Sequence, residues 1–149
     1  MKGVKYMYIK QISVFLQNIR GTLSALTEFL GKNGIDLKAI SVADTANFGI
    51  VRFIVAQDKI DDTAKLLRDG GYSVHVNHVI CVSISDKPSG LAQILGMLEK
   101  ENIAVEYLYS FFRVVDSDAH LILRLSDREA GAALFEKQGV KMLSASELK

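Results

Sequence analysis

Two short loops hold the residues of this sequence that are best suited to contact a small molecule. They are residues 17–23 (QNIRGTL) and residues 85–91 (SDKPSGL), and each separates an alternating apolar segment from a segment with helical spacing. Such a loop precedes a helix N-terminus, where unpaired backbone N–H groups and the positive end of the helix dipole favour an anionic group. The sequence therefore predicts ligand contacts in these two loops.

Histidine and cysteine do not form a pattern typical of a metal site or a nucleophile. His75 and His78 lie three residues apart on a predicted strand, so their side chains point to opposite faces. The single cysteine, Cys81, has no accompanying histidine pattern and is predicted to be a structural thiol. No phosphate-binding glycine motif is present, and no paired carboxylates occur with a plausible catalytic base. We expect no metal, no cofactor and no enzymatic activity; an enzyme using Tyr109 or Asp86 as acid or base is the least favoured hypothesis.

One predicted strand is rich in aromatic residues. Tyr107, Tyr109 and Phe111 share one face of it, and Leu108 and Phe112 share the other. Aromatic rings on a sheet stack bases in some RNA-binding domains. The formal net charge is only +1 and the accompanying basic motif is missing, so we expect no nucleic-acid partner. Packing in the core or in a dimer is favoured, with lining of a ligand pocket as the alternative.

Length and composition limit the remaining classes. The chain has 149 residues, enough for one ordinary domain or two small ones. Hydrophobic residues make up 49% and charged residues 23%, which is typical of an ordered globular protein. No apolar run approaches the roughly 18 residues of a membrane span. We expect a cytoplasmic protein with no membrane partner.

The sequence repeats itself at an offset of 68 residues. The apolar positions that coincide at this offset are Ile12, Val14 and Leu16 with Ile80, Val82 and Ile84. The helical patterns after the two loops also coincide. They end at Gly34 and Asn102, the residue types most common at helix C-termini. Duplication of one structural unit is therefore the strongest prediction.

Each half is predicted to have the order β-α-β-β-α-β. The strands after each first helix are residues 37–43, 50–56 and 72–76 in one half, and 105–115, 121–125 and 140–143 in the other. The second helices are residues 59–69 and 128–138. We expect the registers of the two halves to differ by about two residues, because their loops differ in length. The predicted class is α+β, with two ferredoxin-like βαββαβ units whose helices cover one face of an antiparallel sheet.

The two predicted domains are residues 1–76 and 77–149. No Pro, Gly or Ser tract separates them, and the last strand of the first half is expected to run through Asn77 and His78 into the second half. So short a connection favours two halves that are held together rigidly.

The loops inside this duplicated topology resemble the signature of the ACT domain, Asp-x-Pro-Gly-x-Leu. Asp86, Pro88 and Leu91 match it in the second half, and Gly21 and Leu23 match it in the first. The resemblance spans residues 6 to 146, and the duplication makes it stronger than the short motif alone.

The two loops depart from the signature in different ways. In the first, Asn18 stands in for the acid and Arg20 occupies the proline position. In the second, Gly90 comes one position late, behind Ser89. Asp86 carries a formal negative charge and Asn18 is neutral, so we expect one half-site to bind better than the other.

The resemblance implies a regulatory domain that binds an amino acid. ACT domains typically pair side by side into an eight-stranded sheet, with the ligand held by the first loop of one unit and the second strand of the other. Loop N–H groups suit the carboxylate, and a side-chain oxygen suits the ammonium group. The implied ligand contacts are Asn18, Ile19, Arg20, Gly21, Thr22, Leu23, Ser41, Asp86, Lys87, Pro88, Ser89, Gly90, Leu91 and Tyr109.

The output of such a sensor would pass to a separate partner, and a regulated enzyme in trans is expected. A homodimer is also expected, because Phe15, Ile54, Ile122 and one face of the aromatic strand, on the sheet faces opposite the helices, need cover. Two alternatives stay open. Asn18 and Asp86 are also good helix caps, and the chain as a whole could be a ferredoxin-like interaction or dimerisation module without a ligand.

Overall fold

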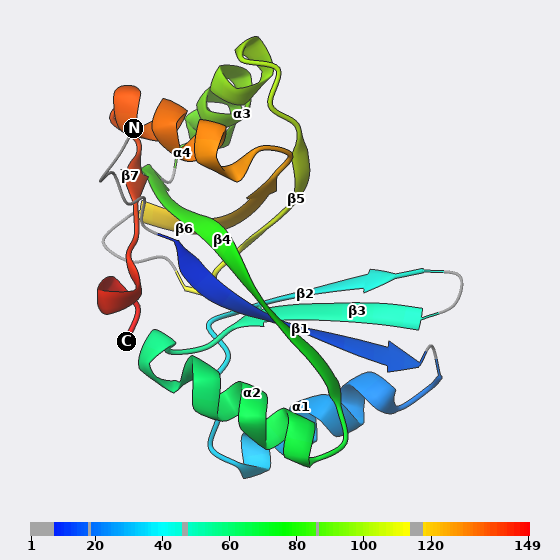
Figure 1. The fold of residues 1–149 in the computed structure, drawn as a ribbon. Coiled ribbons are helices and arrows are strands. Elements are labelled where there is room, and N and C mark those ends of the chain that lie inside the picture. Colours follow the sequence, from blue (N-terminus) through cyan, green and yellow to red (C-terminus); the bar gives the residue numbers. More distant parts are fainter. Residues whose placement is uncertain (1–7, 18, 46–47, 86, 114–117) are drawn as a thin grey trace. The chain divides into compact units, whose positions relative to one another are not determined.

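The computed structural model describes residues 8–17, 19–45, 48–85, 87–113 and 118–149 (Figure 1). In this part of the chain, antiparallel strands combine with four α-helices. The strands are β1 (Ile9–Gln17), β2 (Ala39–Asp44), β3 (Phe48–Ile54), β4 (Ser73–Ser85), β5 (Val105–Ser110), β6 (Asp118–Leu125) and β7 (Lys141–Met142). The helices are α1 (Thr22–Lys32), α2 (Ile60–Asp69), α3 (Gly90–Lys100) and α4 (Arg128–Lys137). Short 3₁₀ turns, η1 (Gln57–Lys59) and η2 (Ala145–Glu147), complete the order.

The chain forms two compact units. Residues 10–78 make up one, called the N unit below. Residues 79–148, together with Tyr8 and Ile9, make up the other, called the C unit. The expected direct connection is confirmed, because β4 is one uninterrupted strand from Ser73 to Ser85. Its alternating Val and Ile residues favour extended backbone, and neither Gly nor Pro interrupts it.

In the N unit, helices α1 and α2 lie together on one side of strands β1, β2 and β3 (Figure 1). Strand β3 is the middle strand of the three and pairs with both of its neighbours. The core between the layers comes from alternate strand positions and from one face of each helix. Its buried residues are Ile12, Val14, Leu16, Leu26, Leu30, Val51, Phe53, Val55, Ile60, Ala64, Leu67 and Val74.

The C unit has the same kind of core. Strand β6 pairs with β4 and β5, and β7 pairs with β4. Helices α3 and α4 pack on the sheet through apolar faces. The buried residues of this core are Ile80, Val82, Ile94, Leu98, Ile103, Leu121, Leu123, Leu125, Ala132 and Phe135.

The helices recur at the offset that the sequence predicts. Both ends of α1 and α3 are 68 residues apart, and so are both ends of α2 and α4. The predicted helix stops are confirmed, because Gly34 and Asn102 both adopt left-handed backbone, with φ of 70° and 57°. The register slip is confirmed as well: Ile12 pairs with Phe53, and its counterpart Ile80 pairs with Leu123.

Several element bounds differ from the prediction. The aromatic strand expected over residues 105–115 is β5, which ends at Ser110. Beyond it the N–H of Phe111 still donates to the carbonyl of His120 at 3.0 Å, and residues 114–115 lie outside the described residues. The last strand, expected over residues 140–143, is only Lys141–Met142.

The inference that Ile54 and Ile122 need a second chain to cover them is wrong. Both side chains are fully buried within the single chain, with 0% of their surface exposed. Phe15 is half-buried and makes edge-on contacts with the rings of Phe48 and His75. Burial of these isoleucines therefore gives no argument for a homodimer. None of the helices in the described ranges is both long and apolar enough to cross a membrane.

Candidate functional site

The loop before α1 is a tight turn that needs glycine. The N–H of Thr22 donates to the carbonyl of Ile19 at 3.3 Å, which closes a four-residue turn. Gly21 has φ 91° and ψ −11°, the values of the third residue of a type II turn. That position requires positive φ, which glycine adopts without steric cost.

The loop before α3 makes the same connection with a different turn. The N–H of Gly90 donates to the carbonyl of Lys87 at 3.0 Å. Ser89, in the position of Gly21, has φ −90° and ψ −6°, which are typical of a type I turn. Pro88 occupies the second position, where its fixed φ is favoured. It thus lies in the turn before α3.

The late glycine of the second loop has its own physical cause. A Cβ atom on Gly90 would lie 2.5 Å from the backbone oxygen of Ser85. Thr22 occupies this place in the first loop, and its hydroxyl donates to the carbonyls of Gln17 and Ile19 at 3.1 and 3.0 Å. In the first loop the Thr22 hydroxyl thus connects the end of β1 to the start of α1. In the second loop the backbone of Gly90 lies directly against the end of β4.

Both loops present backbone donors at the helix start. Among the described residues, no backbone acceptor meets the N–H groups of Leu23 and Ser24 in α1, or of Leu91 and Ala92 in α3. Neither helix has a side-chain cap at its N-cap residue. These donors and the positive helix end can bind an anionic group such as a carboxylate.

The other loop side chains are exposed. Arg20 and Lys87 are exposed and form no ion pair with another described residue, so each places a positive charge beside its loop. Ile19 is 60% exposed, and Leu23 and Leu91 are exposed as well. Asn18 and Asp86, the predicted partners of an ammonium group, lie outside the described residues.

Ser41 and Tyr109 occupy equivalent places on β2 and β5. Ser41 pairs with Arg52, which pairs with Ser13 of β1. Tyr109 pairs with Ile122, which pairs with Cys81 of β4. Ser41 is half-buried and Tyr109 is buried. Because Ile40 and Leu108 pack against the cores, the next residues along each strand face away from the helices.

Neither residue lies beside the loop of its own unit. Ser13 precedes the end of β1 at Gln17 by four residues, which places the row of Ser41 about 13 Å from that loop. Tyr109 lies in the row of Cys81, which also precedes the end of its strand, β4 at Ser85, by four residues. Each unit therefore brings together its five described loop candidates, Ile19–Leu23 or Lys87–Leu91, without its strand candidate.

Sequence reasoning missed the carbonyls of Gln17 and Ser85, which set the geometry of the two loops. The signal available was the exchange of Thr22 for Gly90 at the same repeat position. It also missed Arg52, whose position beside Ser41 follows only from the strand register.

Burial shifts the pKa values of Cys81 and His120 in the C unit. Burial, with a smaller effect of the Glu147 charge, raises the pKa of the Cys81 thiol to about 12. The thiol is therefore protonated and unreactive at neutral pH, as predicted for a structural cysteine. Burial lowers the pKa of His120. No group of His, Cys, Asp and Glu side chains within the described ranges could hold a metal ion.

Comparisons with known proteins agree with this architecture. A family model described as an ACT domain pair matches residues 7–148. The solved structure of protein BT0572 from Bacteroides thetaiotaomicron is 35% identical, with 96% of each chain covered and a TM-score of 0.84. The ligand-free regulatory subunit of aspartate kinase from Thermus thermophilus is 13% identical, with 89% of this chain and 93% of that chain covered and a TM-score of 0.58. At that identity the likeness concerns the fold alone. A search of curated proteins found no match.

Proposed function

The chain belongs to the ACT domain pair family, and from that premise we propose that it is a regulatory protein that binds an amino acid. One observation supports this more than any other. Two loops at equivalent repeat positions have first-turn N–H groups that meet no acceptor among the described residues, although the two loops form different turns. ACT domains are regulatory domains, and the loops have the donors that a carboxylate ligand needs.

In this proposal the ligand's carboxylate accepts hydrogen bonds from the N–H groups of Leu23 and Ser24, or of Leu91 and Ala92. Arg20 or Lys87 adds a positive charge near the carboxylate. The ammonium group binds a side-chain oxygen of Asn18 or Asp86. Only Asp86 supplies a negative charge, so the loop of the C unit is the stronger half-site.

A complete site needs a second ACT unit. Ser41 and Tyr109 lie about 13 Å from the loops of their own units by register. We therefore propose ferredoxin-like βαββαβ domains, residues 1–76 and 77–149, whose sheets pair side by side. The second strand of one domain then completes the ligand site at the loop of another. In a homodimer, the second strand of a domain in the other chain also becomes available to complete the site at each loop.

The effect of the ligand passes to a separate protein. The structure from Thermus thermophilus is itself a regulatory subunit of aspartate kinase. By analogy, we propose that this chain acts in the cytoplasm on an enzyme in trans. The amino acid would order the two loops and favour one arrangement of the paired domains, which biases the partner.

A thermal-shift screen against the twenty common amino acids tests the proposal. A ligand at 100 times its Kd adds about 2.7 kcal/mol to the free energy of unfolding, which raises Tm by several degrees in a protein of this size. Asn18→Ala and Asp86→Ala should reduce the shift, with the larger loss for Asp86→Ala. Asn33→Ala, at the opposite end of α1, is the matched control. No shift with any amino acid at millimolar concentration would instead support a ligand-free interaction module.

A further inference from the structure

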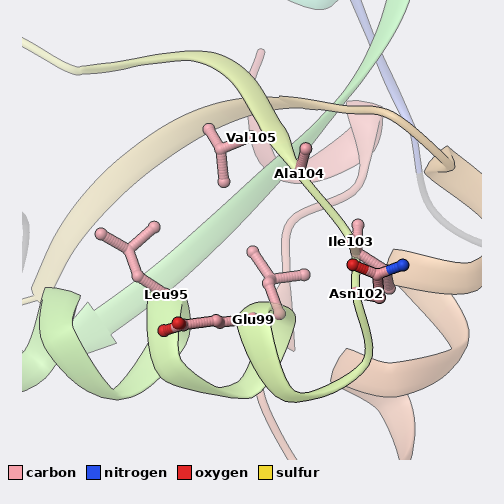
Figure 2. Close-up of a pocket in the computed structure, with 7 residues that line it drawn as sticks. Leu95, Glu99, Asn102, Ile103, Ala104 and Val105 are labelled. Atoms are coloured by element: carbon pink, nitrogen blue, oxygen red, sulfur yellow. The ribbon is translucent and has the colours of Figure 1, made fainter.

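A hollow lies in the C unit at the C-terminal end of α3, opposite the end that follows the loop. It has a volume of about 330 Å³, within the range of small-ligand pockets, and is open to solvent. Figure 2 shows the side chains of Leu95 on α3 and Val105 on β5 pointing toward one another across it. The residues that line it are Leu95, Leu98, Glu99, Asn102, Ile103, Ala104 and Val105. Its wall is therefore mainly aliphatic.

Two polar side chains supply the rest of the lining. Glu99 carries a carboxylate and Asn102 carries a carboxamide, and both residues are exposed. Within the described part of the chain, neither side chain forms a hydrogen bond or an ion pair. Both residues lie at the C-terminal end of α3, where the partial negative charge of the helix dipole favours cations. Lys100, the next residue along the helix, lines a different hollow.

The N unit shows that the fold requires neither side chain. At the offset of 68 residues, glycine occupies both equivalent positions, Gly31 and Gly34. Gly34 and Asn102 share the left-handed conformation, with φ of 70° and 57°. Glycine adopts this conformation without steric cost, whereas an asparagine there retains some strain. The carboxylate and the carboxamide are thus specific to the C unit, at positions where the backbone alone favours glycine.

We propose that this hollow binds an alkylammonium group, a primary amine on a short aliphatic chain. The Glu99 carboxylate, whose side chain extends along α3 toward Leu95 (Figure 2), forms an ion pair with the ammonium group, and the Asn102 carboxamide borders the other end of the hollow. Leu95, Ile103 and Val105 contact the aliphatic chain. The site is separate from the loops of the proposed function, and neither site's test depends on the other. The same chemistry is offered by a free small amine and by a lysine side chain of a peptide.

NMR titration of the full ¹⁵N-labelled chain with n-butylamine at neutral pH tests the site. Saturable shifts of the amides of Leu95, Ile103 and Val105 are expected, with a Kd in the millimolar range. Butan-1-ol and butyrate, which keep the chain but lack the positive charge, should bind at least tenfold more weakly. Equal binding of butan-1-ol, or no saturable shift at these amides, would overturn the proposal.

Two variants test the assigned roles. Glu99→Gln should weaken n-butylamine binding about tenfold, whereas Glu101→Gln, a neighbouring acid outside this hollow, should leave it unchanged. Asn102→Gly copies the N unit and changes the end of the hollow away from the Glu99 carboxylate, so it should fold normally and bind n-butylamine as the wild type does. Equal affinity of wild type and Glu99→Gln would rule out the ion pair. A parallel titration with Nα-acetyl-lysine methylamide identifies the source: binding as strong as n-butylamine assigns a lysine side chain, and weaker binding assigns a free amine.

Discussion

Alanine substitution at Gly21 and at Ser89 should have different effects, although the two residues are equivalent in the repeat. Gly21 is held at φ 91° by a type II turn, and Ser89 is held at φ −90° by a type I turn. A Cβ atom on Gly21 would contact nothing within 4 Å, so the substitution tests backbone conformation without a steric clash. Ser89 makes no side-chain cap hydrogen bond whose loss would complicate the comparison.

The expected change in the free energy of unfolding follows from the two backbone conformations. An L-residue in left-handed backbone is disfavoured by roughly 1–2 kcal/mol, and alanine regains roughly 0.4–1 kcal/mol by restricting the unfolded chain. Gly21→Ala should therefore lower the free energy of unfolding by about 1 kcal/mol. Ser89→Ala requires no change of conformation and should stay within about 0.5 kcal/mol of wild type.

Urea unfolding followed by circular dichroism measures the difference. With an m-value of about 2 kcal/mol/M, Gly21→Ala should lower the midpoint by about 0.5 M, and Ser89→Ala should leave it nearly unchanged. Gly21→Asn is a useful third variant, because asparagine tolerates left-handed backbone better than alanine. Equal midpoints for Gly21→Ala and Ser89→Ala would refute the assignment of different turns to the two loops.

Three further predictions concern the C unit. Gly90→Ala should lower the free energy of unfolding by about 1–3 kcal/mol, because its Cβ atom would lie 2.5 Å from the Ser85 oxygen; an unchanged urea midpoint would contradict that close approach. The Cys81 thiol, with a pKa raised to about 12, should resist iodoacetamide at neutral pH until urea is added. Because its pKa is higher in the folded state, the stability from its burial is present below about pH 8.5 and is lost as the pH rises toward 12; Cys81→Ala should remove this part of the alkaline loss of stability. Asp127→Ala should cost about 1 kcal/mol in thermal or urea unfolding, because the Asp127 carboxylate caps α4 by accepting from the N–H of Ala130 at 3.0 Å.

The helices were predictable because their signals are local. Apolar residues at helical spacing place one face of α1 and α3 in the cores, and left-handed residues at Gly34 and Asn102 stop both helices. Each of these features lies within a few residues of the element that it defines. The repeat then gave a second, independent copy of every helix signal.

The turn types of the two loops could not be predicted from composition. Gly21 and Gly90 both match the glycine of the ACT signature. Glycine is required at position 21 because φ is positive there, and at position 90 because the backbone lies close to Ser85. The two causes differ only in how strand end and helix start meet in space. The exchange of Thr22 for Gly90, one of several differences between the two loops, indicated a different geometry without revealing its form.

The burial of the second sheet faces was likewise beyond the sequence. Ile54 and Ile122 alternate with core residues along their strands. Strand alternation therefore placed them on the sheet face opposite the helices, where a second chain was expected to cover them. Both are fully buried in the single chain. Alternation assigns a residue to a face of a sheet, but it does not tell what lies against that face. The strand partners of Ser41 and Tyr109 depended in the same way on register, which the sequence located only to within about two residues.

Direct calorimetric titration of the full chain with each of the twenty amino acids tests the central claim, that this ACT domain pair is an amino-acid sensor. The account predicts saturable heat from one or a few amino acids and none from the rest. It also predicts that Asp86→Ala weakens the binding by more than Asn18→Ala does, while Asn33→Ala leaves it unchanged. Absence of saturable heat from all twenty at millimolar concentration, in protein that is folded by circular dichroism, would contradict the claim and leave the chain as an interaction module.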